Sequence, residues 1–416
     1  MRIGIVDYGN YSFIRSLSTS LVRAGVQSTY FYNSSFRCPQ FSSTHCNGQG
    51  ATVPVAIKGD INKYAPLQRW FQDREWIAKC LLCLEESALD LVVCANAPIL
   101  VQNRLKQWCR LHQVGFVLWM QDIHGRALRR ILPRRLPLLG TVAASHLDRI
   151  EHRLLRESDH TILISPDHVA YLEGLNIESS KFSVIQNWAD LDEHPQRPKV
   201  NAWSIKNELA YTRNIVYSGT LGMKHDPELL AQLAKGLEFE SDIRVVVISE
   251  GIGADWLRAY KSRNDAHNLV VLPFQPNSEL PNALGSADVV CSILSKEAAE
   301  YSVPSKILTY MCSGRPILMS IPSDNLAARL ISQTESGLVV PPSEPEAFVA
   351  AAHRLLCNPE LRKAMGQKGR AYAEQEFDSE RIVQRFLPIL KKVATRGRQR
   401  PGRATWRGAW DQTGGE

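Results

Sequence analysis

Short apolar runs alternate along the chain with longer segments in which apolar residues recur every three or four positions. Runs of the first kind, such as Arg2–Asp7 and Gly115–Met120, predict buried strands, and segments of the second kind, such as Asn10–Ala24, predict helices with one apolar face. The other strands predicted in the first half are Ser28–Tyr32, Leu89–Cys94, Thr161–Ile164 and Phe182–Ile185. Strands that alternate with helices predict a parallel sheet covered on both faces.

The second half of the chain repeats this scheme. Its predicted strands are Asn214–Ser218, Asp242–Ser249, Asn268–Leu272, Val289–Ser292, Pro316–Met319 and Leu338–Val340. Because 416 residues exceed the size of a single hydrophobic core, we predict two Rossmann-like domains, at residues 1–195 and 196–375. Residues 376–393 are predicted to form a helix that crosses back to the first domain, and residues 394–416, rich in arginine and glycine, a disordered basic tail.

The composition is that of a globular protein, with 44% hydrophobic and 22% charged residues. No apolar run approaches the length of about 20 residues that spans a bilayer, and the first segment is typical of a strand rather than a signal peptide. The nine cysteines are scattered, which favours reduced thiols in the cytoplasm. The pair Cys80 and Cys83 lacks a second pair or nearby histidines, so we assign it no zinc or redox role.

A helix predicted after Val303 carries the clearest local signal. Pro304 suits its first turn, where the missing N–H would have no partner, and Gly314 suits its end, where the backbone turns left-handed. Lys306 lies in the first turn, where a cation opposes the helix dipole. We therefore predict that Pro304, Ser305 and Lys306 bind an anion, with an ordinary surface helix as the alternative.

A glycine-bearing turn follows the first strand of the second domain, with the sequence Ser218-Gly219-Thr220-Leu221-Gly222-Met223-Lys224. Gly219 and Gly222, on either side of Thr220 and Leu221, let backbone N–H groups approach a ligand closely. Lys224 adds a positive charge suited to a phosphate oxygen. This turn alone is weak evidence. Combined with Lys306, however, it supplies the two cations that neutralise a diphosphate, so we predict no metal ion and no metal ligands at this site.

The segment Leu272-Pro273-Phe274-Gln275-Pro276 joins a strand to a helix. Pro273 stiffens it, and the ring of Phe274 is suited to lie beside a planar base. Exposed backbone groups here would pair with the edge of that base. A simple connection between a strand and a helix is the alternative.

In the first domain, Gly9 lies in the turn after the first strand and would let an acceptor or sugar approach. The alternative is a tight turn in which Asn10 or Ser12 caps the next helix. Asp122 follows a strand at the carboxyl edge of the sheet, where we predict that it orients a hydroxyl nucleophile or a sugar. His124 is either an acid or base near neutral pH or a plain surface residue.

The second half resembles the nucleotide-sugar-binding domain of retaining GT-B glycosyltransferases of the family 4 type, and is most similar to bacterial enzymes of capsule, colanic-acid and O-antigen assembly. The resemblance is specific over roughly residues 184–342 and loose over the first domain. The segments that stand in the order of the family are Val184–Asp190, Tyr217–Lys224, Leu272–Phe274, Ala287–Val289 and Val303–Pro316.

This resemblance implies the α/β fold known as GT-B, in which two Rossmann-like domains face each other across a central cleft. It also implies a hexosyltransferase that uses a nucleotide sugar, most often a UDP-sugar, as co-substrate, retains the anomeric configuration, and needs neither a cofactor nor a metal ion. Lys224 and Lys306 would hold the diphosphate and Pro273 and Phe274 the base. Together with Asp122, the two lysines are the residues expected to be catalytic.

The sequence departs from the family at two points. Thr309 stands where the second of the paired glutamates is usual, and Glu297 or Glu300 replaces the first, so Glu300 is our candidate for the ribose or sugar hydroxyls. The histidine of the first domain is displaced, with Gln121 and Asp122 at the strand end instead.

A basic run in the first domain contains no acid and is interleaved with leucine and isoleucine. Its arginines are Arg126, Arg129, Arg130, Arg134 and Arg135. Acceptors in surface-polysaccharide assembly are often lipid diphosphates, so the resemblance suggests that the run between Arg126 and Leu139 rests on an anionic membrane, each cation contributing about 1 kcal/mol. We expect a cytoplasmic protein, peripheral on the inner face of the cell membrane. A solvated helix and loop is the alternative.

Two other functions remain open from the sequence. A nucleotide-sugar epimerase of the same fold would act on the donor without an acceptor. A nucleic-acid-binding protein would use the basic segments, although the chain lacks interleaved exposed aromatics or a zinc or RNA-binding signature.

Overall fold

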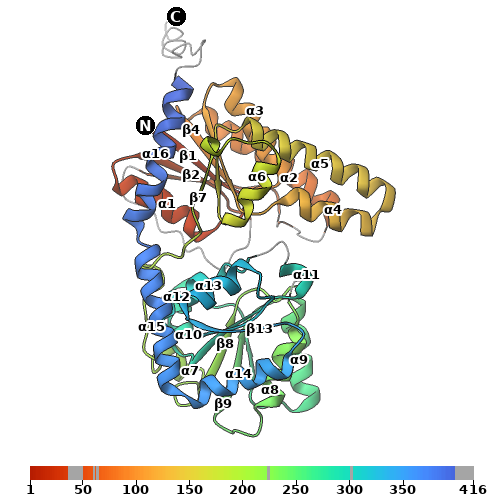
Figure 1. The fold of residues 1–416 in the computed structure, drawn as a ribbon, viewed down its shortest axis with the longest axis vertical. Coiled ribbons are helices and arrows are strands. Elements are labelled where there is room, and N and C mark those ends of the chain that lie inside the picture. Colours follow the sequence, from red (N-terminus) through yellow and green to blue (C-terminus); the bar gives the residue numbers. More distant parts are fainter. Residues whose placement is uncertain (36–49, 60, 62–64, 223–224, 300–302, 399–416) are drawn as a thin grey trace, which may run out of the picture. The chain divides into compact units, whose positions relative to one another are not determined.

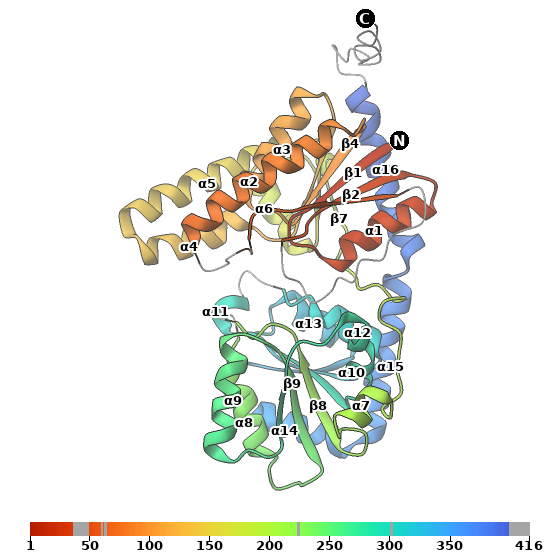
Figure 2. The same ribbon diagram turned by 180° about the vertical axis from the view of Figure 1, so that it is seen from behind.

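The computed structural model describes residues 1–35, 50–59, 61, 65–222, 225–299 and 303–398. They form two compact units. The first contains the described residues up to Ile185 together with those from Val383 onward, and the second runs from Gln186 to Ile382. Each unit is built around one parallel sheet with helices on both faces (Figures 1 and 2), which confirms the predicted pair of Rossmann-like domains.

The first unit contains a seven-stranded parallel sheet with the order β3-β2-β1-β4-β5-β6-β7. Its strands are β1 (Arg2–Asp7), β2 (Gln27–Asn33), β3 (Ala51–Val55), β4 (Leu91–Ala95), β5 (Gly115–Met120), β6 (His160–Leu163) and β7 (Phe182–Val184). Strands β4 and β5 are buried along their whole length, which explains their continuous apolar sequence. Strand β3 was missed because it is a mostly exposed edge strand that contains Pro54, a residue tolerated only at edges.

The helices of the first unit cover this sheet. They are α1 (Ser12–Arg23), α2 (Pro66–Glu85), α3 (Ile99–Leu111), α4 (His124–Arg135), α5 (Pro137–Glu157) and α6 (Val169–Gly174), with short 3-10 turns at Pro166–His168 and Ser179–Lys181. Trp76, Phe116 and Trp119 are fully buried between helices and sheet.

The second unit contains a six-stranded parallel sheet with the order β10-β9-β8-β11-β12-β13. Its strands are β8 (Arg213–Ser218), β9 (Ile243–Ile248), β10 (Leu269–Leu272), β11 (Val289–Ile293), β12 (Ile317–Ser320) and β13 (Gly337–Val340). The direction of winding reverses between β8 and β11. In sheets of this kind, the crevice outside the carboxyl ends of the strands at the reversal is where ligands bind.

Ten helices lie wholly or partly in the second unit, among its described residues. They are α7 (Ala202–Lys206), α8 (Pro227–Gly236), α9 (Ile252–Asn264), α10 (Leu280–Gly285), α11 (Lys296–Ala299), α12 (Lys306–Ser313), α13 (Leu326–Thr334), α14 (Pro345–Cys357), α15 (Pro359–Glu376) and the start of α16 (Ser379–Arg398), with a 3-10 turn at Asn277–Glu279. From Val383 onward, α16 belongs to the first unit.

The boundaries differ from those predicted. The division between the units falls after Ile185, ten residues earlier than expected, because the first sheet ends with β7. Helix α16 continues to Arg398, so residues 394–398 are helical and not part of a tail. Its buried face extends to Val393 and Ala394, and Phe386 makes an edge contact with Trp119, with ring centroids 5.0 Å apart. The rest of the predicted tail lies outside the described residues.

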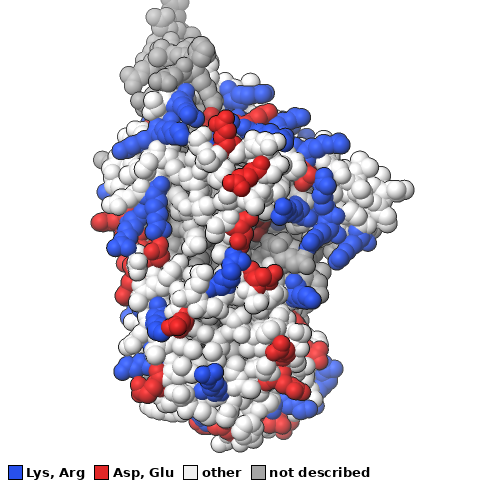
Figure 3. All heavy atoms as spheres, viewed as in Figure 1, with Lys and Arg blue, Asp and Glu red and all other residues white. Residues whose placement is uncertain are grey.

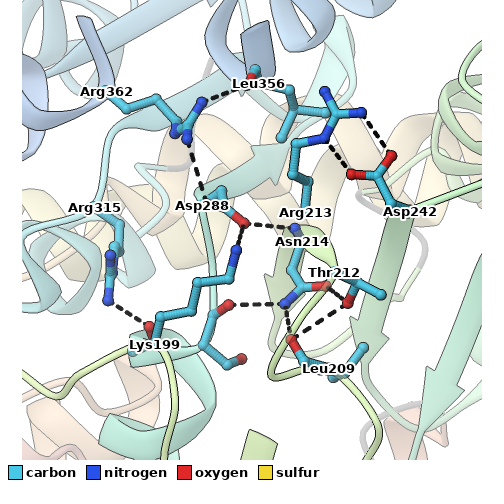
Figure 4. A network of polar contacts seen from close by, with 12 residues as sticks. Lys199, Leu209, Thr212, Arg213, Asn214, Asp242, Asp288, Arg315, Leu356 and Arg362 are labelled. Atoms are coloured by element: carbon cyan, nitrogen blue, oxygen red, sulfur yellow. Dashed lines mark hydrogen bonds and ion pairs between the residues drawn. The ribbon is translucent and has the colours of Figure 1, made fainter. Parts of the chain in front are cut away.

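A buried carboxylate holds together the edge of the second sheet at which its strands begin (Figure 4). Asp288 directly precedes β11 and accepts hydrogen bonds from the backbone N–H of Asn214, at 2.8 Å, and from Lys199 Nζ, at 2.6 Å. Arg362 on α15 lies 3.6 Å from its other oxygen. One side chain thus ties β8, β11, α15 and the segment before α7 to one another.

We predict that Asp288→Ala lowers the free energy of unfolding by about 3 kcal/mol, because it leaves Lys199 and Arg362 without their anion. The matched control is Asp255→Ala, which breaks an exposed ion pair with Arg258 on α9 and should cost less than about 1 kcal/mol. Urea unfolding followed by circular dichroism measures both. Equal losses in the two variants would contradict this role of Asp288.

Candidate functional site

The predicted helix after Val303 is observed at the carboxyl edge of the second sheet. It is α12, with Lys306 as its first residue, and Gly314 ends it with a left-handed φ of 66°. Pro304 and Ser305 lie directly before it, and Ser305 is exposed. Since α12 follows β11 and β12 follows α12, Lys306 enters from the side of the sheet at which β8 and β11 end.

The amine of Lys306 lies against the turn that follows β8. Its Nζ is 3.8 Å from the centre of the Tyr217 ring and 3.0 Å from the point where a Cβ on Gly219 would lie. Gly219 adopts φ = 135°, which other residues rarely do. The structure therefore brings two predicted site residues, Lys306 and Gly219, together. Glycine is favoured at position 219 for two reasons: its backbone conformation, and the lysine chain that occupies the space where a side chain would lie.

This amine is buried without a partner. Although other parts of the residue reach the surface, the Nζ of Lys306 is shielded from solvent and has no hydrogen-bond partner among the described residues. Burial lowers the pKa of Lys306 to about 7. The nearby Cys291 acts in the opposite direction and raises this pKa, but its effect is smaller. An unpaired ammonium group in such a place is costly. A bound anion would remove this cost, which makes Lys306 the strongest candidate for ligand binding in the second unit.

Two tyrosines that sequence reasoning missed shape this turn. The backbone N–H of Ser218 donates to Tyr310 Oη at 2.9 Å, and the Tyr310 hydroxyl lies 3.0 Å from the Ser218 carbonyl oxygen, so α12 is fastened to the end of β8. The hydroxyl of Tyr217 donates to the carbonyl oxygen of Thr220 at 2.9 Å. The available signal was a tyrosine on the buried face of an apolar strand or helix, because a buried hydroxyl needs a partner.

The remaining predicted residues of the second unit are only partly described. Thr220 is exposed, and the N–H of Gly222 donates to His225 Nδ1 at 3.2 Å. Lys224 and Glu300 lie outside the described residues. Thr309 lies on α12 and is half-buried.

The predicted base-binding loop follows β10, two strands away from β8 in the sheet. Pro273 is exposed and Phe274 is half-buried. The N–H of Phe274 donates to the Glu250 carboxylate at 3.3 Å, and Gln275 accepts a hydrogen bond from the Trp203 indole at 2.9 Å. Glu250, which follows β9, was missed by sequence reasoning, because nothing in its local sequence indicates a contact with a loop 24 residues later.

In the first unit, Asp122 lies between β5 and α4, close to His168. Burial lowers the pKa of His168, and the Asp122 carboxylate acts in the opposite direction. The Nδ1 atom of His124 lies 3.9 Å from the carboxylate of Glu151, which is buried and accepts hydrogen bonds from the N–H of Gly125 and the hydroxyl of Tyr171. Burial raises the pKa of Glu151. The strand end therefore carries a cluster of titratable groups, of which Glu151 was not predicted.

The turn after β1 is organised by a residue that the sequence analysis also missed. The buried carboxylate of Asp7 accepts hydrogen bonds from the N–H groups of Gly9, Asn10 and Tyr11 and from the hydroxyl of Tyr30. Burial raises the pKa of Asp7 to about 7, and these bonds oppose that rise. Tyr11 is the cap residue of α1 and makes no side-chain capping bond, so the alternative in which Asn10 or Ser12 caps this helix is not observed.

Gly9 is closely packed in this turn. A Cβ on Gly9 would collide with the side chains of Asn96 and Tyr11. The glycine is thus explained by contacts within the chain, and an approach of a sugar or acceptor to Gly9 stays a prediction.

The basic run forms α4 and the start of α5, which lie antiparallel to each other (Figure 1). Two of its arginines are held within the unit, since Arg129 pairs with Asp148 at 2.8 Å and Arg126 stacks on Tyr171. The end of α4 and the start of α5 together expose large apolar side chains, and Figure 3 shows an uncharged tip with lysine and arginine side chains beside it. The exposed apolar residues are Ile131, Leu136, Leu138, Leu139 and Val142.

In the part of the chain that the structure describes, no helix is both long enough and apolar enough to cross a bilayer.

Comparison with known proteins identifies the second unit. Residues 203–372 match the family model described as "Glycosyl transferases group 1". These residues therefore form a glycosyltransferase group 1 domain, and they include Tyr217, Gly219, Lys306 and Tyr310.

Two curated bacterial proteins are similar to this chain. The putative colanic acid biosynthesis glycosyl transferase WcaI of Escherichia coli K12 is 24% identical over 236 residues, which are 56% of this chain and 56% of WcaI, so the match spans little more than half of that relative. The probable glycosyltransferase WbjE of Pseudomonas aeruginosa is 20% identical over 283 residues, which are 68% of this chain and 70% of WbjE.

Among solved structures, HepE of Anabaena, determined in complex with UDP, has a similar fold, with a TM-score of 0.65 and 14% sequence identity. The superposition covers 94% of this chain and 100% of HepE. Similarity at this level shows the fold alone. The fold is that of the GT-B glycosyltransferases, as the sequence analysis predicted.

We predict that Lys306→Met makes the protein more stable than the wild type near pH 7 and that this advantage shrinks as the pH rises. Between pH 7 and about 10.5 the unfolded chain keeps the lysine proton that the folded chain loses, so the wild type gains up to about 1.4 kcal/mol per pH unit. The methionine variant has no such dependence at this position. Urea unfolding at several pH values measures the difference, and a constant gap would contradict the burial of a titrating amine.

Proposed function

We propose that this protein is a glycosyltransferase that moves a sugar from a nucleotide-sugar donor, of the UDP type, to a hydroxyl group of a saccharide or lipid-linked acceptor in the biosynthesis of a surface polysaccharide. The observation that carries the proposal is the buried, unpaired amine of Lys306 beside Gly219, at the point where the second sheet reverses its winding. The match of residues 203–372 to glycosyltransferases and the similarity to WcaI support it.

The donor diphosphate is the anion proposed for this site. Its oxygens would accept hydrogen bonds from Lys306 and from the N–H groups at the start of α12, where the helix dipole favours negative charge. Lys224 is the proposed second cation, and Pro273 and Phe274 are proposed to contact the base. Two cations offset the diphosphate charge, so the proposal includes no metal ion at this site. The structure of HepE with UDP supports a uridine nucleotide as the donor class.

In the proposed reaction, the bond between the anomeric carbon and the diphosphate oxygen breaks, and the acceptor oxygen bonds to that carbon on the same face, which retains its configuration. The proton of the acceptor hydroxyl passes to the departing phosphate oxygen. Lys306 stabilises the negative charge that grows on this oxygen. Asp122 is proposed to orient the acceptor hydroxyl in the first unit.

The tip formed by the end of α4 and the start of α5 supports a membrane-bound acceptor. Leu138 and Leu139 are 84% and 74% exposed, and Arg130 and Arg134 are close to them in sequence. Apolar side chains that insert among lipids, flanked by cations that face anionic headgroups, are typical of peripheral attachment. We therefore propose that this tip rests on the cytoplasmic face of the membrane, near a lipid diphosphate acceptor.

No feature of the described residues favours the two alternatives, an epimerase or a nucleic-acid-binding protein. Incubation with the donor alone separates the epimerase, because only an epimerase would convert the nucleotide sugar without an acceptor.

We predict that Lys306→Ala lowers the rate of sugar transfer about 100-fold, because removing one group that stabilises a charged transition state has an effect of this order. The nucleotide is first identified from the rise in melting temperature with UDP, GDP or ADP. Transfer is then followed as nucleotide release in the presence of the acceptor. The matched control, Lys235→Ala, removes an exposed lysine from α8 and should leave the rate unchanged. Full turnover by the folded Lys306→Ala variant would overturn the proposal.

We predict that the double variant Leu138→Asp, Leu139→Asp sediments with anionic vesicles at least about 10-fold more weakly than the wild type, because it removes two apolar side chains from the lipid and adds two repelled charges. Leu111→Asp changes an exposed leucine at the end of α3 and serves as the control. Vesicles of neutral lipid test the contribution of Arg130 and Arg134. Equal binding by all the proteins would rule out attachment through this tip.

A further inference from the structure

Three side chains with metal-binding atoms converge on a part of the second unit that the proposed reaction does not use. His353 and Cys357 lie one turn apart on α14 and therefore face the same side of the helix. Glu240 lies between α8 and β9, shortly before β9 begins. This is the edge at which the strands start, whereas Lys306 lies at the edge where they end. The group is thus separate from the proposed donor site.

The geometry of the three side chains is that of ligands around one centre. The Nε2 atom of His353 lies 2.9 Å from Glu240 Oε1 and 3.4 Å from Cys357 Sγ, and all three ligand atoms lie within 4.8 Å of one another. Zinc binds oxygen, nitrogen and sulfur at about 2.0 to 2.3 Å, so its ligands are about 3 to 4 Å apart. Small rotations of the side chains would bring these atoms to such positions.

The hydrogen bonds among the three side chains join Cys357 Sγ to the imidazole of His353 and leave one ligand atom, Glu240 Oε1, unsatisfied. Glu240 Oε1 is shielded from solvent and makes no hydrogen bond to a described residue, although His353 Nε2 is so close. A single proton on Nε2 can be donated to the carboxylate or to the sulfur, but not to both. A cation at their common centre would satisfy all three atoms, and this removes the cost of the shielded oxygen.

A second set of contacts orients the carboxylate. Arg213 pairs with the other oxygen of Glu240, Oε2, and binds both oxygens of Asp242 at 2.7 Å. Oε2 is thereby engaged, which leaves Oε1 directed at His353. Groups that hold a ligand in this way are characteristic of metal sites, because they fix its orientation before the metal binds.

The set of ligand atoms selects the metal. One sulfur, one imidazole nitrogen and one carboxylate oxygen suit zinc, whereas calcium and magnesium prefer oxygen alone. The thiolate and the carboxylate together balance the charge of Zn²⁺. Binding would release the thiol proton of Cys357 to solvent and involves no change of oxidation state.

We propose that Glu240, His353 and Cys357 form a zinc site, with a water molecule as the fourth ligand, which fastens the end of α14 to the segment before β9. This site is independent of sugar transfer and goes beyond the proposed function. Its consequence is that zinc stabilises the second unit by mass action.

The test uses the full-length protein after treatment with a chelator, titrated with Co²⁺ as a coloured substitute for zinc. We predict that the wild type develops a thiolate-to-cobalt charge-transfer band and four-coordinate ligand-field bands at one metal per chain, and that zinc removes them. Cys357→Ser should abolish the charge-transfer band, and His353→Ala or Glu240→Gln should weaken cobalt binding at least about 10-fold.

The matched control is Cys83→Ser, which removes a partly exposed cysteine on α2 and should leave the spectrum unchanged. Zinc should also raise the melting temperature of the wild type and of Cys83→Ser, but not that of Cys357→Ser. Because Cys357 is exposed, its variant should fold, and the melting temperature of the metal-free proteins checks this. An unchanged cobalt spectrum in Cys357→Ser, or no charge-transfer band in the wild type with excess cobalt, would overturn the proposal. Either result leaves the test of Lys306 unaffected.

Discussion

The desolvation of one amine is the constraint on which the site in the second unit depends. Lys306 Nζ is held against the face of the Tyr217 ring, out of contact with water, and no hydrogen-bond acceptor in the described chain meets it. Folding alone does not explain a charge in such a place, because methionine would fill the space without the cost. The protein keeps a group that is unfavourable until an anion arrives. The hydrogen bonds between Tyr310 and Ser218 maintain that position, because they fix the middle of α12 to the end of β8.

The two edges of the second sheet differ in whether a buried charged group has partners within the chain. At the edge where the strands begin, Asp288 is surrounded by cations and by a backbone donor, so its charge is fully compensated. At the edge where they end, the amine of Lys306 meets no hydrogen-bond acceptor among the residues that the structure describes. Structural charges are compensated within the chain, whereas a binding charge is compensated by its ligand. This contrast distinguishes the two groups more clearly than burial does, since both are shielded from water.

The sequence was sufficient for the framework and insufficient for the buried polar partners. Apolar periodicity predicted the strands of both sheets except β3, and the spacing from Pro304 to Gly314 predicted α12, because these patterns depend on neighbours in the chain. Asp7 and Tyr310 were missed, because their partners are set by packing between distant segments: Tyr310 bonds to a residue 92 positions away. Lys306 was found for a local reason, its place in the first turn of a helix. The feature that makes it exceptional, a buried amine with no hydrogen-bond acceptor among the described residues, required the folded structure.

The contact between Lys306 and Gly219 has a consequence for which basic residue the fold admits. The ammonium group is compact, and it fits between an aromatic ring and a bare Cα. A guanidinium is planar and wider, with donors spread along a fork. Only the flat stacking of its plane on the Tyr217 ring would place it in the same space, and its donors would then point along the ring. The slim end of the lysine chain instead leaves one compact charge beside Gly219, so the shape of the side chain at position 306 matters to this turn as well as its charge.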